Sequence, residues 1–477
     1  MRSSLHEDDR AKKGYGTMTL IKSISGIRGT IGGKVNEGLT PVDATKFAAA
    51  YGTWLKNRNN GKVTVVIGRD ARLSGEMISN LVSSTLIGLG IDVVDLGLST
   101  TPTVEIAVPM EKAQGGIILT ASHNPKQWNA LKLLNEKGEF ISGYDGKEVL
   151  EIAENDAYDF AEVDNLGVIS MNDTYLSKHI ESILNLELVN KEAIANANFS
   201  VVVDAVNSSG GIFVPALLDA LGVKNVTKLY CEPTGHFPHN PEPLPEHLTD
   251  LSEKIRETRA DLGITVDPDV DRLALVCEDG SMFGEEYTLV AVADYVLSKT
   301  PGSTVSNLSS TRALRDVTEA AGQSYFASAV GEVNVVAKMK AENAVIGGEG
   351  NGGVIYPASH YGRDSLVGIA LFLSHLAEKQ MSVTELKNSY PSYTISKNKI
   401  ELTPSIDVDN VLASIAEKYA HKEVDTTDGV KIYIGKEWVH LRKSNTEPII
   451  RVYSESQDLS AANELAERII SEIKALI

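Results

Sequence analysis

Three aspartates, Asp267, Asp269 and Asp271, stand at alternate positions of one short segment, DPDVDR, directly after the apolar run GITV. Alternate residues of an extended segment point to the same side, so the three carboxylates can converge on one hard cation. Ligands that are all oxygen favour Mg²⁺ or Ca²⁺ over zinc. The segment therefore predicts a metal site, with a solvated acidic turn as the alternative.

An EF-hand calcium loop is the structural competitor, and Glu278 even occupies its twelfth position. That loop needs glycine at its sixth position, where this chain has Arg272. The residues that follow, LALVC, have the pattern of a strand, whereas an EF-hand loop leads into a helix. The EF-hand interpretation is therefore disfavoured.

The motif TASHNP, Thr120–Pro125, follows the apolar run GGIIL. Its serine, Ser122, stands where a strand gives way to a loop, which can present the hydroxyl for chemistry. Acyl hydrolysis is disfavoured because the G-x-S-x-G pattern of a nucleophile elbow is absent. On this motif alone, a plain Ser/Asn/Pro turn is an equal alternative.

The segment GGEGNGG, Gly347–Gly353, has five glycines in seven residues. Glycines let a backbone approach a ligand closely. The side chains that remain, Glu349 and Asn351, suit sugar hydroxyls. The segment has neither a G-K-[ST] ending nor a dinucleotide-binding fingerprint. It is therefore a candidate sugar-binding loop, with a tight structural loop as the alternative.

A donor-rich segment, RKSNTEP, combines an arginine fork with hydroxyls, an amide and successive backbone N–H groups, which suits a bound phosphate. In a chain with a formal charge of −19, such a loop is a candidate phosphate site, although a surface turn remains the alternative. Arg451 follows closely and can add a second fork. The candidate residues are Arg442, Ser444, Asn445, Thr446 and Arg451.

Two isolated basic residues are weaker candidates. Arg28 lies among glycines in SGIRGTIG, and Lys132 lies between apolar neighbours in NALKLL. Either can be a surface residue whose charged end reaches water. His123 and His360, taken alone, are more often structural than catalytic.

The elements around these motifs alternate between short β-branched runs and helical patterns, which favours βαβ units with mostly parallel sheets. From about Tyr393 the chain changes to several strand-like runs followed by one long helix. We expect an α/β fold of three consecutive α/β domains with mixed, mostly parallel sheets and a C-terminal α+β domain. The expected ranges are a tail at 1–17, then 18–171 with the serine loop, 172–279 with the metal loop, 280–387 with the sugar loop and 388–477 with the phosphate loop.

Composition excludes several classes of protein. Of 477 residues, 45 are basic and 64 acidic, and a net charge of −19 disfavours binding to nucleic acid or to an anionic membrane surface. Two cysteines, Cys231 and Cys277, are too few for a disulfide framework, which favours the reducing cytoplasm. No targeting segment is expected in residues 1–17. The most apolar stretch, Leu366–Ala377, is too short to span a bilayer and predicts a buried helix.

Together, TASHNP, DPDVDR, GGEGNGG and RKSNTEP resemble the four active-site loops of the α-D-phosphohexomutases, in this order and at these spacings. The resemblance runs from about Ile21 to the C-terminus. It implies four domains around a central cleft, each contributing one loop. It also implies a phosphorylated hexose as substrate and leaves the oligomeric state open.

For the serine and metal loops, the resemblance implies that Ser122 carries the phosphoryl group. Asp267, Asp269 and Asp271 would bind one Mg²⁺ per active site together with an oxygen of phosphorylated Ser122, and Arg272 would orient the site. A catalytic trace of hexose 1,6-bisphosphate would act as activator.

For the basic residues and the sugar loop, the resemblance implies that Arg28 and Lys132 act in acid/base chemistry or charge stabilisation. Glu349, with Asn351, would bind sugar hydroxyls. Many members of the family have serine at the position of Asn351 and histidine at that of Gly353. A catalytic histidine is therefore in question here, with His123 and His360 as candidates to replace it.

The phosphate loop would hold the phosphate that does not react, through Arg442, Ser444, Asn445, Thr446 and Arg451. The expected reaction interconverts glucosamine 6-phosphate and glucosamine 1-phosphate through a bisphosphorylated sugar. Mannose and glucose phosphates are the alternative substrates. A non-catalytic sugar-phosphate-binding protein and a simple phosphatase are alternatives of other classes.

Overall fold

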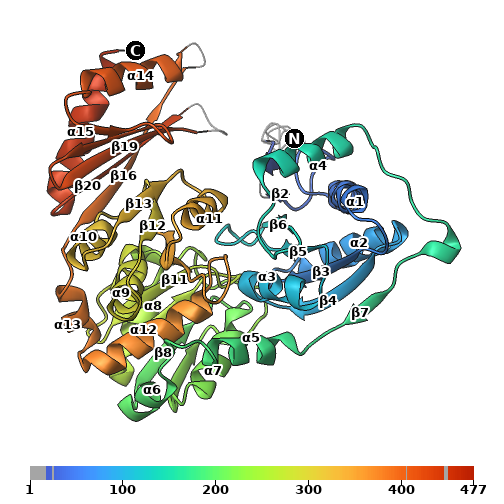
Figure 1. Ribbon diagram of the computed structural model, residues 1–477, viewed down its shortest axis with the longest axis horizontal. Helices are drawn as coiled ribbons and strands as arrows, with labels where there is room; N and C mark the ends of the chain where they lie inside the picture. Colours follow the sequence, from blue (N-terminus) through green and yellow to red (C-terminus); the bar gives the residue numbers. More distant parts are fainter. Residues whose placement is uncertain (1–17, 24–25, 404–405, 445–448, 477) are drawn as a thin grey trace, which may run out of the picture. The chain divides into compact units, whose positions relative to one another are not determined.

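The computed structural model describes residues 18–23, 26–403, 406–444 and 449–476 (Figure 1). The predicted tail, residues 1–17, lies outside the described residues. The chain forms two compact units. Unit 1 comprises the described residues up to Leu176 with Asn207–Ser209 and Glu232–Glu242, and unit 2 comprises Ser177–Val206, Gly210–Cys231 and the described residues from Pro243 onward.

Unit 1 is built on a seven-stranded mixed sheet in the order β1-β2-β6-β5-β3-β4-β7. The pairs from β5 to β7 are parallel, and those from β1 to β5 are antiparallel. The strands are β1 (Ile21–Ser23), β2 (Gly26–Thr30), β3 (Thr64–Arg69), β4 (Asp92–Leu98), β5 (Gly115–Leu119), β6 (Trp128–Leu134) and β7 (Ile169–Met171). The helices are α1 (Pro41–Arg58), α2 (Gly75–Gly88), α3 (Thr101–Met110), α4 (Gly143–Glu154) and the 3₁₀ turn η1 (Val163–Asn165).

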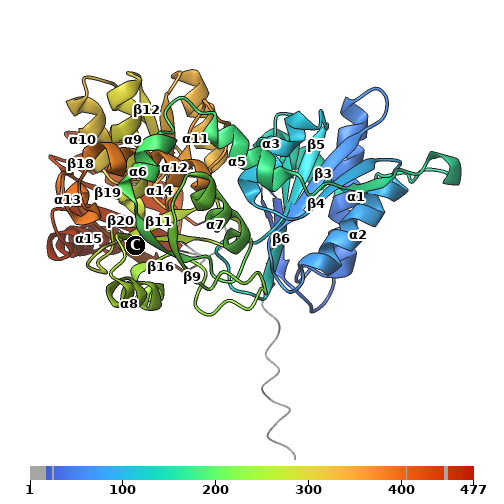
Figure 2. The same ribbon diagram turned by 90° about the horizontal axis from the view of Figure 1, so that it is seen from below.

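Helices cover both faces of this sheet, which explains why its central strands are apolar on both sides. Val65 packs in the core under α1, α2 and α4, whereas its neighbour Val66 packs under α3. Figure 2 shows α3 and the α1–α2 pair on opposite sides of the strands. The carboxyl end of β5 therefore stands in a rigid frame, and the Ser122 loop begins there.

The second sheet, in unit 2, has the order β11-β10-β8-β9, with an antiparallel edge at β11. All five residues of β10 are buried. Its strands are β8 (Ser200–Asp204), β9 (Asn225–Leu229), β10 (Leu262–Val266) and β11 (Leu273–Cys277). The neighbouring helices are α5 (Tyr175–Leu184), which begins in unit 1, α6 (Lys191–Ala197), α7 (Gly210–Ala220), the 3₁₀ turn η2 (Pro245–His247) and α8 (Thr249–Thr258).

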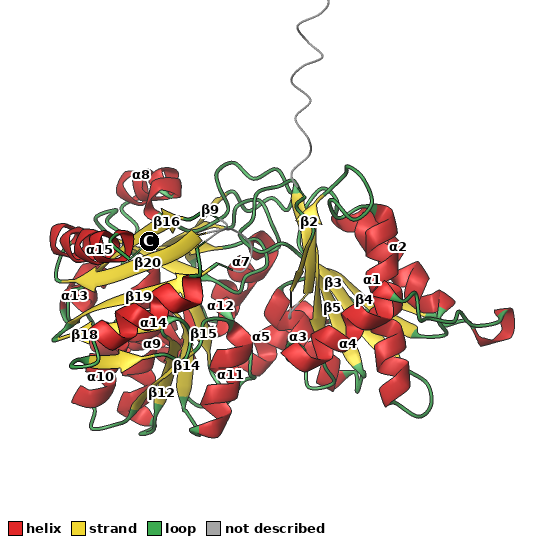
Figure 3. Ribbon diagram, turned by 90° about the horizontal axis from the view of Figure 1, so that it is seen from above, coloured by secondary structure: helices red, strands yellow, loops and turns green. Residues whose placement is uncertain are grey.

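The third sheet has the order β13-β12-β14-β15, again with one antiparallel edge, and helices flank it (Figure 3). Val335 and Met339 of α11 pack against Val305 and Ile355. Its strands are β12 (Thr304–Asn307), β13 (Tyr325–Ser328), β14 (Ile346–Glu349) and β15 (Gly353–Ile355). The helices are α9 (Glu285–Lys299), α10 (Ala313–Ala320), α11 (Glu332–Ala341), α12 (Ser365–Lys379) and α13 (Val383–Asn388).

The fourth sheet is antiparallel throughout, in the order β16-β20-β19-β18-β17. Helices α14 and α15 supply Leu412, Ile415, Leu465 and Ile469 to the core on one of its faces (Figure 1). The strands are β16 (Thr394–Glu401), β17 (Glu423–Asp425), β18 (Val430–Ile434), β19 (Glu437–Lys443) and β20 (Ile449–Ser456), with α14 (Val408–Lys418) and α15 (Leu459–Lys474).

The predicted fold class is confirmed: three mixed sheets with helices are followed by an antiparallel sheet with two helices. The expected helix at Leu366–Ala377 is part of α12 and is buried from Ser365 to Leu376. Sequence reasoning missed α14 and the short β17. Among the described residues, no helix combines the length and apolar character needed to cross a bilayer. Both cysteines are free. The domain boundaries stay a prediction.

Candidate active site

The loop that carries Ser122 follows β5 directly, as its sequence predicts. Ser122 has φ +49°, in the left-handed region that side-chain-bearing residues rarely adopt. Its N–H donates to Oγ1 of Thr120 (2.9 Å), and that hydroxyl donates to Oδ2 of Asp70 (2.6 Å). The Ser122 side chain is 8% exposed. The unusual backbone conformation persists because neighbouring groups hold it.

Arg72 fixes the serine loop, and sequence reasoning overlooked it. It is 2% exposed, and its guanidinium lies 5.2 Å from the ring of Phe237. Nε donates to Oδ2 of Asp70 (3.0 Å). The Nη1 and Nη2 groups donate to the loop carbonyls of Ser122, Asn124 and Pro125 and to the carbonyl of Trp128, the first residue of β6. A usable signal was the paired Asp70 and Arg72 directly after a buried strand.

Arg28 and Lys132 lie on β2 and β6, two adjacent strands of the unit 1 sheet, and β6 also pairs with β5. Arg28 of β2 stands opposite Ala130 of β6, and Lys132 follows two residues later, so the two side chains share one face of the sheet. Lys132 itself stands opposite Ile118 of β5, and its Nζ lies 5.8 Å from the ring of Phe140. Unit 1 thus brings both basic candidates to the strands next to the serine loop, and their catalytic roles stay predictions, as does that of the half-buried His123.

In unit 2, the three aspartates converge as predicted. Asp267, Asp269 and Asp271 are fully buried, and each offers an oxygen within 4.8 Å of the others. The assumed reason was wrong, since the segment is a turn and not an extended run. The N–H of Val270 donates to the carbonyl of Asp267 (3.1 Å), and Val270 has φ +65°.

The donor set fits a divalent cation. The backbone N–H groups of Asp271 and Arg272 donate to Oδ1 of Asp267, each at 3.1 Å, and so orient that carboxylate. Three buried carboxylates this close together repel one another unless a cation compensates them. Oxygen ligands are those that Mg²⁺ prefers. The residues that follow the loop form β11, so the EF-hand alternative is excluded.

The glycine loop between β14 and β15 lies against the start of β11. The Leu273 N–H donates to the Gly352 carbonyl (3.0 Å). A Cβ on Gly352 would stand 2.3 Å from the Leu273 oxygen, and one on Gly350 would stand 1.9 Å from Oε2 of Glu286. These two glycines therefore allow close approach to protein atoms, whereas the sequence suggested close approach to a ligand. They bring the glycine loop beside the metal loop.

Glu349, which is predicted to bind sugar hydroxyls, already accepts hydrogen bonds from protein groups at both of its carboxylate oxygens. It is 4% exposed. Its Oε1 accepts from Nδ2 of Asn307 (2.8 Å) and from the Gly331 N–H (3.1 Å), and its Oε2 accepts from Nη1 of Arg363 (3.0 Å). Asn351 accepts from the N–H of Gly353 (3.2 Å). Arg363 belongs to no recognisable motif, so sequence reasoning missed it.

Arg442 and Arg451 stand directly opposite each other on β19 and β20. Like charges directly opposite each other destabilise a sheet, and a bound anion would compensate both of these positive charges. The pair therefore indicates an anion site. Nε of Arg442 lies 2.9 Å from Oδ2 of Asp428, which also accepts from the Val330 N–H (2.9 Å).

The phosphate loop itself is described only in part. The N–H of Ser444 donates to the carbonyl of Ile449 (3.1 Å). Asn445 and Thr446 lie outside the described residues.

His360 contacts Asp364, the residue that caps α12. Its Nε2 is 3.0 Å from Oδ2 of Asp364, which also meets Nε2 of His179 (2.8 Å). Asp364 caps α12 through the N–H groups of Leu366 and Val367. Burial tends to raise the pKa of Asp364, but the two histidines hold it well below its usual range. The observed partner of His360 is therefore a helix cap, and its alternative catalytic role stays a prediction.

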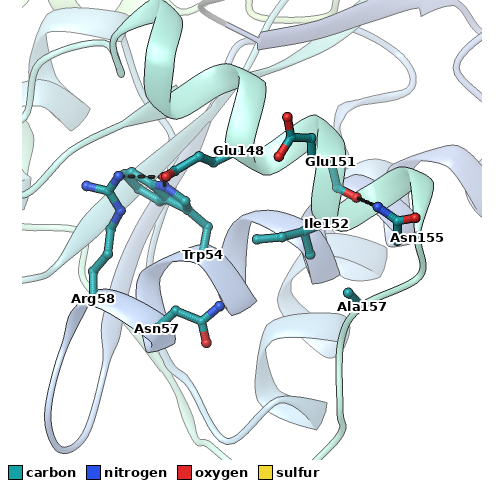
Figure 4. A pocket seen from close by; sticks show the side chains of 8 residues that line it. All are labelled: Trp54, Asn57, Arg58, Glu148, Glu151, Ile152, Asn155 and Ala157. Carbon is teal, nitrogen blue, oxygen red and sulfur yellow. Dashed lines mark hydrogen bonds and ion pairs between the residues drawn. The ribbon is translucent and has the colours of Figure 1, made fainter.

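A surface pocket between α1 and α4 contains none of the predicted site residues (Figure 4). Its cation, Arg58, already meets Glu148 (2.6 Å) and stacks on Trp54. This pocket is therefore not the candidate active site.

Comparison with known protein families decides the identity of the fold. Four family models match in order: phosphoglucomutase/phosphomannomutase alpha/beta/alpha domains I, II and III, and the C-terminal domain. They match residues 21–159, 177–280, 284–393 and 402–472. The chain belongs to the phosphoglucomutase/phosphomannomutase family. The predicted resemblance is confirmed, and this phosphohexomutase is an intramolecular phosphotransferase.

Relatives of this phosphohexomutase carry names for more than one substrate. A phosphoglucomutase/phosphomannomutase of Thermococcus kodakarensis is 36% identical, over 92% of this chain and 96% of the relative. A phosphoglucosamine/phosphogalactosamine mutase of Sulfurisphaera tokodaii is 31% identical, over 95% and 98%. A crystal structure of a family member from Burkholderia thailandensis superposes with a TM-score of 0.82 at 26% identity, covering 95% of this chain and 96% of that one.

Replacing Arg72 with Met should unfold the serine loop of this phosphohexomutase. The change takes the guanidinium away from the buried carboxylate of Asp70 and removes one donor from each of four carbonyls, so the stability of unit 1 should fall by about 3–5 kcal/mol. Urea denaturation followed by far-ultraviolet circular dichroism measures this. Arg58→Met removes an exposed cation from the same unit and should cost far less. Equal losses of stability in the two variants would contradict the role of Arg72 in holding the serine loop.

Replacing Asp269 with Asn keeps the shape of the side chain but removes one carboxylate from the triad. Isothermal titration calorimetry should show Mg²⁺ affinity reduced by at least about tenfold. The melting temperature in EDTA should not fall, because the amide relieves repulsion between the carboxylates. Asp219→Asn, at a surface position 82% exposed, is the matched control. An unchanged Mg²⁺ affinity in the Asp269 variant would argue against the site.

Proposed function

We propose that the protein is a phosphoglucosamine mutase, which interconverts glucosamine 6-phosphate and glucosamine 1-phosphate. The observation that carries this proposal is the convergence of three buried carboxylates in a chain of the phosphohexomutase family that also retains Ser122. A protein that only bound sugar phosphates would have no use for such a metal loop, which disfavours the non-catalytic alternative. The cytoplasm is the proposed compartment, because both cysteines are free.

In the proposed reaction, Ser122 carries a phosphoryl group. The bond between phosphorus and the Ser122 oxygen breaks, and a bond from phosphorus to a sugar hydroxyl oxygen forms. The hydroxyl proton passes to a basic group, and the Ser122 oxygen takes up a proton from an acidic group. The resulting hexose bisphosphate turns over and returns its other phosphoryl group to Ser122, which restores the phosphoserine. A trace of hexose 1,6-bisphosphate would phosphorylate protein that has lost its phosphate. Arg28 on β2 and Lys132 on β6 are the proposed acid/base or charge-stabilising residues.

Asp267, Asp269 and Asp271 would hold Mg²⁺ together with an oxygen of phosphorylated Ser122, and Arg272 would help orient the site. Bound Mg²⁺ would neutralise charge on the transferring phosphoryl group. Arginine forks are suited to phosphate, so Arg442 and Arg451 would hold the phosphate that does not react. One anion site that accepts either phosphate of the intermediate is what a turnover within the protein requires.

The sugar would be bound by Glu349 and Asn351. The names of relatives support both glucosamine phosphate and glucose or mannose phosphate as substrates. One relative is named for glucosamine and galactosamine phosphates, and another for glucose and mannose phosphates. Phosphomannomutase/phosphoglucomutase activity is therefore the alternative within the same mechanism.

A ³¹P NMR time course with Mg²⁺ and the matching trace bisphosphate tests both the mechanism and the substrate. Glucosamine 6-phosphate should be converted to its 1-phosphate faster than mannose or glucose 6-phosphate is converted. Ser122→Ala should abolish all isomerisation, because it removes the phosphoryl carrier. Ser84→Ala, at an exposed position on α2, should retain full activity.

The outcomes separate the alternatives. Faster conversion of mannose or glucose phosphate would keep the mechanism and overturn the glucosamine preference. Near-normal activity in the Ser122→Ala variant would contradict the phosphoserine mechanism. Release of inorganic phosphate without isomerisation would reveal a phosphatase, and no reaction with any of the three sugars would favour the binding protein.

A further inference from the structure

One guanidinium links the metal loop to the sugar loop. Nη2 of Arg363 donates to Oδ2 of Asp271 (2.7 Å), and Nη1 donates to Oε2 of Glu349 (3.0 Å). Nε donates to Oε2 of Glu332 (3.0 Å). The Arg363 side chain is 10% exposed, so these contacts are shielded from water. Two residues with different proposed roles thus depend on one buried cation.

The space for this guanidinium exists because position 353 is glycine. A Cβ on Gly353 would stand 2.3 Å from Cδ of Arg363 and 3.0 Å from Cγ. Gly353 is not in the left-handed region, so its backbone does not require glycine. Any side chain at this position would need the same space. Gly353 and Arg363 therefore form a matched pair.

Arg363 is held in place by contacts within the protein. Its N–H donates to Oε1 of Glu332 (2.8 Å), so that carboxylate grips both the backbone and the side chain of Arg363. The backbone bridges to Ile355 at the end of β15. The next residue, Asp364, caps α12. A side chain supported in this way can impose its geometry on Asp271 and Glu349.

We propose that Arg363 is a positioning residue that fixes Asp271 as a metal ligand and Glu349 as a sugar-binding group in one rigid arrangement. Groups that orient a metal ligand commonly change metal affinity or activity by about 10–100-fold when they are replaced. The same guanidinium sets the position of Glu349, so its loss affects hexose binding as well. The sugar half of this proposal rests on the proposed function, whereas the metal half does not.

Arg363→Lys is the first test, because lysine keeps the charge but cannot bridge three carboxylates as a fork does. Calorimetric titration with Mg²⁺ alone should show affinity lower by about 10–100-fold. At saturating Mg²⁺, the KM for glucosamine 6-phosphate should rise, and kcat should fall. Arg315→Lys, at a partly exposed arginine that also meets two carboxylates, Glu319 and Glu423, should change none of these values.

Gly353→Ala is the second test, because it removes no charge. Its methyl group enters the space of Cδ and displaces the guanidinium, so Mg²⁺ affinity should fall as in Arg363→Lys, by less. The methyl group would also stand 3.1 Å from Oδ1 of Asn351, so Mg²⁺ affinity, and not KM, is the deciding measurement in this variant. Melting temperatures of all variants show whether each is folded.

The proposal is overturned if folded Arg363→Lys and Gly353→Ala variants both bind Mg²⁺ and hexose phosphate within twofold of the unmodified protein. If Arg363→Lys does not fold, Gly353→Ala decides by its Mg²⁺ affinity under the same criterion. The Mg²⁺ titration needs no turnover, so weakened Mg²⁺ binding supports the metal half even in a protein that converts no hexose phosphate. If the variants bind Mg²⁺ unchanged and isomerise hexose phosphate normally, the proposed role of Arg363 is overturned and the proposed function stands.

Discussion

Buried negative charge is the constraint on which the rest of unit 2 depends. Asp267, Asp269, Asp271, Glu332 and Glu349 are all buried, and a buried carboxylate is costly unless a cation or hydrogen-bond donors compensate it. A single guanidinium meets three of the five. The convergence of the aspartate oxygens is suited to a divalent cation, which would compensate the other two carboxylates of this group.

Both reactive loops are held from outside by an arginine fork. Arg72 binds the carbonyls of the serine loop, and Arg363 binds the carboxylates of the metal and sugar loops. Each loop also contains a left-handed residue that is not glycine, Ser122 in one and Val270 in the other. Conformations of this kind persist only where the surroundings over-determine them. Arg72 binds the carbonyl of Ser122 itself, whereas Val270 is held by backbone hydrogen bonds to Asp267 and Ser365.

Further contacts extend from the sugar loop to the phosphate strand. Val330 and Gly331 donate successive N–H groups, the first to Asp428, which pairs with Arg442, and the second to Glu349. The segment before α11 therefore contacts groups from two proposed ligand sites. A substrate that carries both a phosphate and sugar hydroxyls would meet parts of the protein already joined by hydrogen bonds.

The sequence by itself determined the elements and the four chemical loops. Alternating apolar strands and helical runs predicted the three mixed sheets, and the loops at their strand ends carried recognisable residues such as Ser122 and the aspartates. These features are local, since a strand, a turn and a cluster of like residues all leave their pattern in consecutive positions. Membership of the phosphohexomutase family followed from the same four segments.

Only the tertiary structure decided what holds those loops. Arg72 lies 50 residues before Ser122, and Arg363 lies 92 residues after Asp271, so no local pattern joins either pair. The glycines of the sugar loop illustrate the same limit, because their neighbours are a backbone carbonyl of β11 and a side chain of α9. The reason is physical: the compensation of a buried charge depends on which groups packing brings within about 3 Å, the hydrogen-bonding distance, and packing joins residues far apart in the chain.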